Sequence, residues 1–269
     1  LRPDDEAANR HILSSLFTTP GSLAMLEEWL AVVSKIPDRL AAIHEAQPWR
    51  LVDWKTAGRH LTYRRFFEIA GLVGLRVEDI GVFEDTHRLI LDLVREGIVD
   101  GLRIDHIDGL ADPAAYLKRL RAAVGAGTFI VVEKILERSE APPADWPVAG
   151  TTGYEVIAAL ADVFVDETGQ ERLQHAFAAL KPEAGRRSYE AERKASKRQM
   201  LAENFAGEVA AVTAIAKTIA DAGGLNFDRD TLCEAIRAVI TTLPVYRTYT
   251  TATSVSENDR ELVERVWEE

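Results

Sequence analysis

The sequence predicts an α/β fold that is rich in helices, and three features support this prediction. Two short apolar strands, at 102–104 and 129–133, alternate with helical segments at 85–96 and 113–124. The second strand is a continuous apolar run, which is typical of strands buried on both faces of a parallel sheet. Residues 156–242 carry an almost uninterrupted helical pattern. Strands that alternate with helices in this way are typical of parallel sheets, including eight-stranded barrels.

The composition indicates a globular protein with an acidic surface. The chain has 269 residues, of which 47% are apolar and 28% charged, with a net charge of -11 and a pI near 5.1. This length suits one large domain, or one domain with an inserted lobe. The negative charge argues against binding to nucleic acid or to an anionic membrane surface. It favours a neutral small molecule or a sugar as ligand, and a cytoplasmic location.

The sequence contains no recognisable targeting or membrane segment. No apolar run reaches the roughly 20 residues that a membrane helix requires, and the N-terminus is polar and acidic. Cys233 is the single cysteine, so an internal disulfide is excluded, and its helical setting indicates a small core residue. The first residue is Leu1 rather than methionine. We therefore expect the chain to be processed or to be a piece of something longer.

The first part of the chain, residues 1–47, predicts a small helical lobe. A helical pattern over 4–17 is interrupted by a Pro-Gly pair. Ser22 is then expected to cap a second helix that continues to about residue 36. A third helical segment at 38–47 follows a proline.

Residues 48–83 are richer in aromatic residues and arginines, among them Tyr63, Arg64, Phe66 and Phe67. Such residues suit sugar binding, because aromatic rings stack on sugar faces and arginines donate hydrogen bonds to hydroxyl groups. The alternative is that Phe66 and Phe67 belong to the core and that the arginines form structural ion pairs.

Helix boundary signals flank the two predicted strands. The amphipathic helix at 85–96 ends at Gly97. Asp112 and Pro113 predict the cap and the first residue of the next helix, which stops at Gly125. The Gly-Thr run near residue 150 predicts a shaped active-site loop.

The remainder of the chain is predicted to be mainly helical. The stretch 188–222 reads as one long helical piece, the stretch 244–250 resembles a strand, and a short helix follows Ser256.

The ends of the two strands carry the residues best suited to chemistry. Arg103, Asp105, His106 and Asp108 occupy four of six positions at the end of the first strand, and Glu133 ends the second. Because an unpaired charge is costly to bury in a core strand, this cluster indicates a site. In barrels of alternating strands and helices, catalytic residues lie at these C-terminal strand ends.

Two carboxylates at neighbouring strand ends predict a glycosidase-type site. In a retaining mechanism they lie about 5–5.5 Å apart, one as nucleophile and one as acid/base. Arg103 shares a strand face with Asp105 and would keep this nucleophile ionised. Burial would keep a proton on Glu133 for the leaving group, and His106 is placed to bind a sugar hydroxyl.

Two alternatives for this cluster stay open. In the first, Arg103 and Asp105 form a structural ion pair at the strand end and take part in no chemistry. In the second, His106, Asp105 and Asp108 bind a metal ion, although the sequence has no second histidine at ligand spacing.

The same residues resemble a known superfamily. The stretch 101–106 resembles the nucleophile strand of the alpha-amylase superfamily, and 129–134 resembles the strand that carries its acid/base. Further blocks, taken together, resemble the maltooligosyltrehalose synthases over about residues 45–250. In chain order these blocks are 63–67, 75–78, 82–83, 86–87, 105–110, 133–136, 150–154 and 244–247.

The resemblance implies a partial (β/α)8 TIM-type barrel with a large helical insertion, helix-rich overall. It divides the chain into a helical lobe (1–47), a partial barrel segment with the catalytic strands (48–155), a helical insertion (156–242) and an incomplete return towards the barrel (243–269).

The resemblance also implies an isomerase, a (1→4)-α-D-glucan 1-α-D-glucosylmutase that converts the reducing-end α-1,4 linkage of a maltooligosaccharide to α,α-1,1. Asp105 would attack the anomeric carbon, and Glu133 would protonate the leaving glucose, which turns and attacks the intermediate through its own anomeric hydroxyl. No metal or organic cofactor is implied. The partner would be a maltooligosaccharide or glycogen-derived glucan, not nucleic acid or a membrane. The substrate-binding residues would be Arg103, His106, Tyr63, Arg64, Lys134 and Tyr154.

The chain departs from the family at single positions and in length. Thr62, Ile107 and Glu155 stand where the family usually has Asn, Pro and Asp. Family members are much longer, so we expect missing barrel segments to supply earlier strands and a third catalytic carboxylate after Glu269. The isolated chain is then expected to be weakly active or inactive. Two other functions stay open: a glucan hydrolase or transferase of the same superfamily, and a non-catalytic glucan-binding or interaction module.

Overall fold

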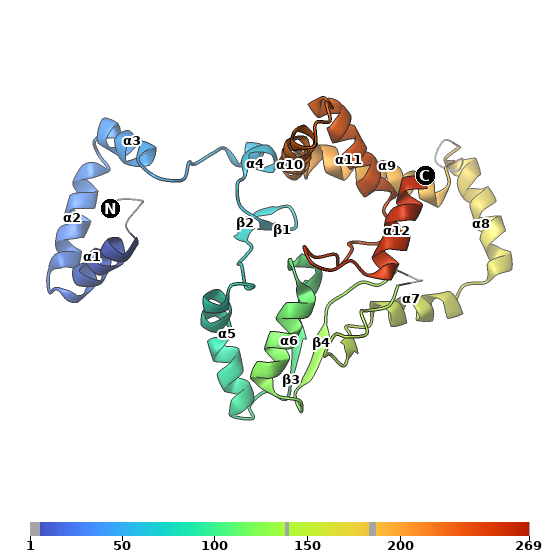
Figure 1. Ribbon diagram of the computed structural model, residues 1–269, viewed down its shortest axis with the longest axis horizontal. Helices are drawn as coiled ribbons and strands as arrows, with labels where there is room; N and C mark the ends of the chain where they lie inside the picture. The colour runs from blue at the N-terminus through green and yellow to red at the C-terminus, as the bar shows by residue number, and fades with distance from the viewer. Residues whose placement is uncertain (1–5, 138–139, 183–186, 269) are drawn as a thin grey trace. The chain divides into compact units, whose positions relative to one another are not determined.

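The computed structural model of the protein describes residues 6–137, 140–182 and 187–268 (Figure 1). The chain divides into two compact units, residues 1–57 and 58–269. Helices dominate both units, and the described residues form one two-stranded and one three-stranded sheet in the second unit. The prediction of a helix-rich chain that contains parallel strands is confirmed, whereas the barrel stays a prediction. No helix in the described ranges combines the length and the apolar character needed to span a membrane.

The N-terminal unit is helical, as predicted. Its elements are α1 (Glu6–Thr18), α2 (Ser22–Val33), α3 (Pro37–Glu45) and the 3-10 turn η1 (Trp54–Thr56). The prediction that Ser22 caps the second helix is wrong, because Gly21 occupies the cap position with φ of 78° and no side chain caps the helix. The helix also ends at Val33 instead of residue 36. Pro37 begins α3 and restricts Ile36 before it to an extended backbone.

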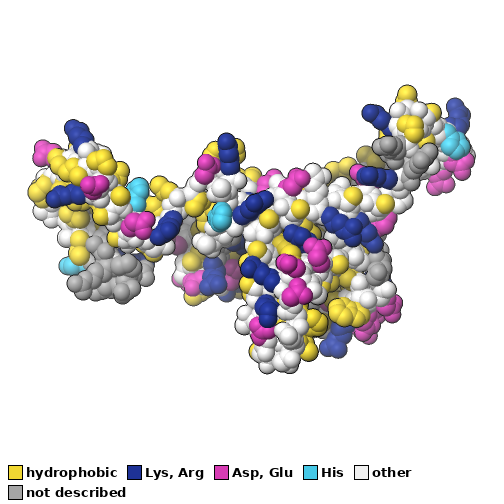
Figure 2. Space-filling view, turned by 90° about the horizontal axis from the view of Figure 1, so that it is seen from above, with side chains coloured by type: hydrophobic (Ala, Val, Ile, Leu, Met, Phe, Trp, Pro, Cys, Tyr) yellow, Lys and Arg dark blue, Asp and Glu magenta, His cyan; other side chains and the backbone are white. Residues whose placement is uncertain are grey.

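The helices of the N-terminal unit expose much apolar surface. Phe17, Met25 and Trp29 have exposed fractions of 69%, 65% and 50%. Hydrophobic side chains are accordingly prominent on this unit in the space-filling view (left in Figure 2). Its helices therefore bury little apolar surface among themselves.

The second unit is built on a parallel sheet of β3 (Gly101–Ile104), β4 (Phe129–Val132) and β5 (Gly150–Thr151), in that order. The pairing of β3 with β4 confirms both predicted strands and their parallel direction. The sequence predicts a loop at β5, but this segment pairs as a strand with the end of β4. The C-terminal ends of β3 and β4 thus meet at one edge of the sheet.

Helices α5 (Ile80–Arg95) and α6 (Pro113–Val124) contribute to one hydrophobic core with this sheet. Leu117 and Leu120 of α6 and Ile130 and Val132 of β4 are completely buried. Full burial of each such side chain stabilises the fold by about 1.5–3 kcal/mol. This core holds the two strands, and with them the strand ends, in a fixed relation.

The ends of α5 and α6 follow capping chemistry. The Asp112 carboxylate accepts a hydrogen bond from the Ala115 amide at 2.9 Å, which confirms the predicted cap of α6. Helix α5 was predicted to begin at residue 85, but it begins five residues earlier, at Ile80. Asp79 causes this earlier start, because its carboxylate accepts from the Gly81 amide at 2.9 Å.

His87 and Tyr116 join α5 to α6 through a partly buried hydrogen bond. His87 Nδ1 lies 2.9 Å from the Phe83 carbonyl oxygen, so this nitrogen carries the proton and donates. Nε2 then accepts from the Tyr116 hydroxyl at 2.8 Å. Burial lowers the pKa of His87, against the opposing hydrogen bond to Phe83, and raises the pKa of Tyr116 to about 12. Both groups therefore stay neutral near pH 7.

The hairpin of β1 (Arg65–Phe66) and β2 (Ile69–Val73) was not predicted. Arg65 is buried and donates to the Glu208 carboxylate at 2.9 Å and to the Asn204 carbonyl. For Arg65, the alternative prediction of a structural ion pair is therefore confirmed. The hairpin is thereby fixed to the helical part of the unit.

The stretch 156–242, predicted to be almost entirely helical, is mainly helical over its described residues. The helices are α7 (Tyr154–Val163), α8 (Glu167–Leu180), α9 (Tyr189–Glu203), α10 (Ala206–Ala222) and α11 (Arg229–Thr242), and the short α4 (Ala57–His60) precedes the hairpin. The prediction of one helical piece over 188–222 is wrong. The chain leaves the helical conformation at Phe205, with φ of -115° and ψ of 22°, so that α10 can turn back on α9.

The prediction of a strand at 244–250 is also wrong, because this segment pairs with no strand. Its side chains are instead used for contacts with the turn that follows β3. Arg247 donates to the carbonyl oxygens of Asp108 at 2.9 Å and Ala111 at 3.3 Å. The final predicted helix is confirmed as α12 (Glu257–Glu268).

Candidate active site

Asp105 and Glu133 occupy equivalent positions at the ends of two paired strands. Ile104 pairs with Val132, and the Glu133 amide donates to the Ile104 carbonyl oxygen at 2.7 Å. The residues that follow, Asp105 and Glu133, are therefore lateral neighbours on strands about 4.8 Å apart. This edge of the sheet brings together the two carboxylates that the sequence analysis selected.

The two carboxylates have different surroundings. Asp105 Oδ1 lies 3.2 Å from Arg103 Nη2, and both side chains are more than half exposed. An ion pair this exposed contributes only about 0–1 kcal/mol to stability. Glu133 is half-buried, and its Oε2 accepts a hydrogen bond from the His106 amide at 2.7 Å. One oxygen of Glu133 is thus fixed by the backbone of the neighbouring strand end.

His106 adopts a strained backbone and lies among aromatic rings. Its φ of 49° is in the left-handed region, as is that of Phe67 at 50°. Such a conformation costs on the order of 1–3 kcal/mol in a non-glycine residue and tends to occur at functional sites. The rings of His106 and Phe67 contact each other, with centroids 4.7 Å apart. The ring centroids of Phe66 and Tyr246 lie 5.0 and 6.4 Å from that of His106.

This aromatic cluster was only partly visible in the sequence. Phe66 and Phe67 were selected for sugar binding or for the core, whereas Tyr246 was missed as a site residue. The signal for Tyr246 was its place in the block 244–247. The structure gives Phe67 an exposed fraction of 45% and Tyr246 one of 61%, so both rings offer apolar surface beside His106.

Gly109 makes room for the His106 ring. A Cβ atom at Gly109 would lie 2.4 Å from Cδ2 and 2.7 Å from Nε2 of His106. On the sequence-based prediction of a sugar site, we expect Gly109→Ala to displace this ring and to lower the affinity for maltopentaose, which isothermal titration would measure. Gly127→Ala is the control, because a Cβ there meets nothing within 4 Å. Equal affinities of the two variants would contradict a role for the His106 ring.

The other predicted binding residues lie in different settings. Tyr63 and Arg64 are exposed at the start of the hairpin, and the Tyr63 hydroxyl donates to the Ala70 carbonyl at 2.5 Å. Tyr154 is 38% exposed at the first turn of α7. Lys134, by contrast, has an ammonium group inside the protein.

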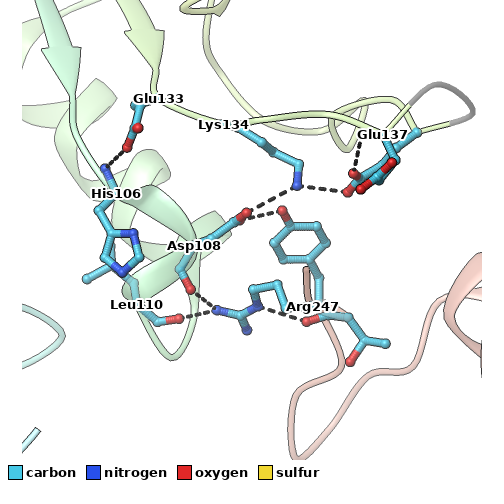
Figure 3. A network of polar contacts seen from close by, with 10 residues as sticks. His106, Asp108, Leu110, Glu133, Lys134, Glu137 and Arg247 are labelled. Atoms are coloured by element: carbon cyan, nitrogen blue, oxygen red, sulfur yellow. Dashed lines mark hydrogen bonds and ion pairs between the residues drawn. The ribbon is translucent and has the colours of Figure 1, made fainter. Parts of the chain in front are cut away.

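Lys134 is the centre of a buried ionic network. Its side chain is 0% exposed, and Nζ lies 3.1 Å from Asp108 Oδ2 and 2.8 Å from Glu140 Oε1. The other Asp108 oxygen accepts from the Tyr249 hydroxyl at 2.6 Å. Figure 3 shows Lys134 and Asp108 pointing toward each other, beside the pair of His106 and Glu133. In this arrangement the Lys134 ammonium has its partners within the protein.

Comparisons with known proteins give the site a family context. No protein-family model matches the chain. A curated protein of Mycobacterium tuberculosis (strain ATCC 25618 / H37Rv), named maltooligosyl trehalose synthase, is 47% identical over 134 residues. This match covers 49% of the chain and 17% of that protein.

Solved structures give a longer match. Maltooligosyltrehalose synthase from Arthrobacter ramosus is 34% identical with a TM-score of 0.71, over 84% of this chain and 28% of that one. A hypothetical maltooligosyl trehalose synthase from Sulfolobus tokodaii is 30% identical with a TM-score of 0.69, over 85% of this chain and 28% of that one.

The chain is therefore homologous to a part of each of several longer proteins, and these proteins are named as trehalose-forming synthases. Within that class its relatives are the maltooligosyltrehalose synthases, and the resemblance found in the sequence motifs is confirmed. The matched region spans between about a sixth and little more than a quarter of the relatives' length.

Proposed function

We propose that this chain carries the nucleophile and the acid/base of a maltooligosyltrehalose synthase. The reaction would convert the reducing-end α-1,4 linkage of a maltooligosaccharide into an α,α-1,1 linkage and yield maltooligosyl trehalose. The observation that supports this most is the lateral pairing of Asp105 and Glu133 at the ends of β3 and β4. Retaining glycosidases use two carboxylates at such close range.

In the proposed first step, an Asp105 oxygen bonds to the anomeric carbon of the penultimate glucose unit. The bond from that carbon to the glycosidic oxygen breaks, and Glu133 gives its proton to this oxygen. Because Glu133 Oε2 is bound by the His106 amide, the free oxygen of Glu133 is the one placed to carry the proton.

In the second step, the released glucose turns and its anomeric hydroxyl attacks the intermediate. Glu133 takes the hydroxyl proton, and the bond to Asp105 breaks. The site must exclude water during this turn, since water would yield a hydrolysis product instead.

We propose that Arg103, His106, Tyr63, Arg64 and Tyr154 contribute to glucan binding. The rings of Phe67 and Tyr246 beside His106 would add apolar surface for a sugar face. The reaction needs no metal or organic cofactor, and a cytoplasmic location suits a glycogen-derived glucan.

We further propose that β3, β4 and β5 form one part of a (β/α)8 barrel. The remaining strands, and a third carboxylate that stabilises the transition state, would correspond to parts of the longer relatives that this chain does not match. The four sequence segments 1–47, 48–155, 156–242 and 243–269 remain the proposed division into lobe, barrel segment, helical insertion and return.

Product analysis tests this function. The protein, expressed from its complete reading frame, is incubated with maltopentaose, and the products are separated by chromatography. A non-reducing pentasaccharide that contains an α,α-1,1 linkage is the expected product. Shorter reducing sugars would instead indicate a hydrolase, longer glucans a transferase, and binding without turnover a non-catalytic module.

A further inference from the structure

The loop that follows β3 is held by side chains from β4's continuation and from the segment 244–250. This loop begins with Asp105 and His106 and continues into the 3-10 turn η2 (Ile107–Gly109). Asp108, in the middle of the turn, is buried and uses both carboxylate oxygens, one for Lys134 Nζ and one for the Tyr249 hydroxyl. Asp108 therefore anchors the loop backbone two residues after His106.

Lys134 connects this anchor to the second strand end. It follows Glu133 directly, so one position of the chain carries the proposed acid/base and the next carries the buried cation. Nζ bridges Asp108 and Glu140 and also lies 5.5 Å from the centre of the Tyr249 ring. The two strand ends are thus joined by an ion pair as well as by the hydrogen bond from His106 to Glu133.

Tyr249 and Arg247 bring the segment 244–250 into the same network. The guanidinium of Arg247 donates to three carbonyl oxygens of the loop, on Asp108, Leu110 and Ala111. It also lies 5.2 Å from the centre of the Tyr249 ring, so Arg247, like Lys134, places a cation near that ring. Burial and the hydrogen bond to Asp108 raise the pKa of Tyr249, so its phenol remains a proton donor.

We propose that Lys134, Asp108 and Tyr249 form a positioning network that holds His106 and Glu133 in their reactive arrangement without touching the glucan. This proposal rests on the proposed function and changes one expectation from the sequence, in which Lys134 binds the substrate directly. Lys134 and Asp108 are buried, and their polar atoms are occupied by protein partners. Their influence on the reaction would pass through the loop backbone.

The variant Tyr249→Phe tests the network, because it removes one hydroxyl and keeps the ring. In the protein expressed from its complete reading frame, we expect kcat for maltooligosyl trehalose formation to fall about 10- to 100-fold, because small displacements of reacting groups have effects of this size. KM for maltopentaose should change little, since no network atom contacts the glucan. Hydrogen–deuterium exchange of the backbone at 101–111 should become faster.

Tyr116→Phe is the matched control. It also removes a buried tyrosine hydroxyl, the one that donates to His87 at 2.8 Å in the same core. We expect this control to keep kcat and the exchange rate of 101–111 unchanged. Equal losses of kcat in both variants, or a rise of KM alone in Tyr249→Phe, would overturn the proposal.

Two further arms keep the test decisive. If Tyr249→Phe does not fold, Arg247→Lys takes its place, because lysine cannot reach all three loop carbonyls, and the same results are expected. If the unsubstituted protein forms no maltooligosyl trehalose, the proposed function fails independently of the network. The exchange comparison then decides the network alone, and unchanged exchange at 101–111 would overturn it.

Discussion

Replacing Asp105 by asparagine is expected to lower kcat for the trehalose-forming reaction by at least about 10³-fold, because the variant lacks the nucleophile. Glu133→Gln is expected to lower kcat by about 10²–10⁴-fold, the range for loss of a general acid/base. Both glutamine and asparagine keep the size of the side chain they replace. Initial rates with maltopentaose would measure both effects, and Asp145→Asn, an exposed carboxylate paired with Lys118, is the control.

A substrate with a fluoride leaving group separates the two roles. Fluoride leaves without a proton, so Glu133→Gln should still form a covalent glycosyl-enzyme from α-maltotriosyl fluoride, whereas Asp105→Asn should not. Mass spectrometry of the quenched protein detects this adduct. An adduct on Asp105→Asn would show that another residue is the nucleophile, and equal failure of both variants would contradict the assignment of Glu133 as acid.

The parts of the fold that were predicted correctly rest on local signals. An apolar run identifies β4, and the pair of Asp112 and Pro113 identifies the start of α6, because both depend on a few adjacent residues. The segment 244–250 was mistaken for a strand because alternating apolar and polar residues also occur in extended segments. Its role depends on partners such as Asp108, 141 residues away from Tyr249 in the chain.

The same division applies to the candidate site. Asp105 and Glu133 could be selected because a charge at the end of an apolar strand is conspicuous in the sequence. The left-handed backbone of His106 could not be predicted, because a non-glycine residue adopts this conformation only uncommonly and the surrounding structure has to hold it there. Burial of Lys134 was also unpredictable, because lysine is rarely buried and its ionic partner Asp108 lies 26 residues away in the chain.

Lys134→Met is expected to destabilise the protein by about 3–5 kcal/mol, the cost of breaking a buried ion pair from one side. Methionine fills nearly the same volume, so the loss would come from charge and not from a cavity. The Asp108 and Glu140 carboxylates, 9% and 12% exposed, would lose the cation that lies between them. The free energy of unfolding from urea titration measures the effect.

Lys118→Met supplies the matched surface control. Its pair with Asp145 is more than half exposed on both sides, so its loss should cost at most about 1 kcal/mol. A similar cost for Lys118→Met and Lys134→Met would contradict the view that burial makes the Lys134 network strong.

A double-mutant cycle then separates charge from packing. Asp108→Asn removes one of the two carboxylates but keeps an oxygen that can accept from the Tyr249 hydroxyl. The double variant Lys134→Met with Asp108→Asn should therefore be less destabilised than the sum of the two single changes. Independent sites add within about 0.5 kcal/mol, so additivity within that range would contradict direct coupling. A larger coupling would mean that the charge of Asp108, placed two residues after His106, is tolerated in the core because of Lys134.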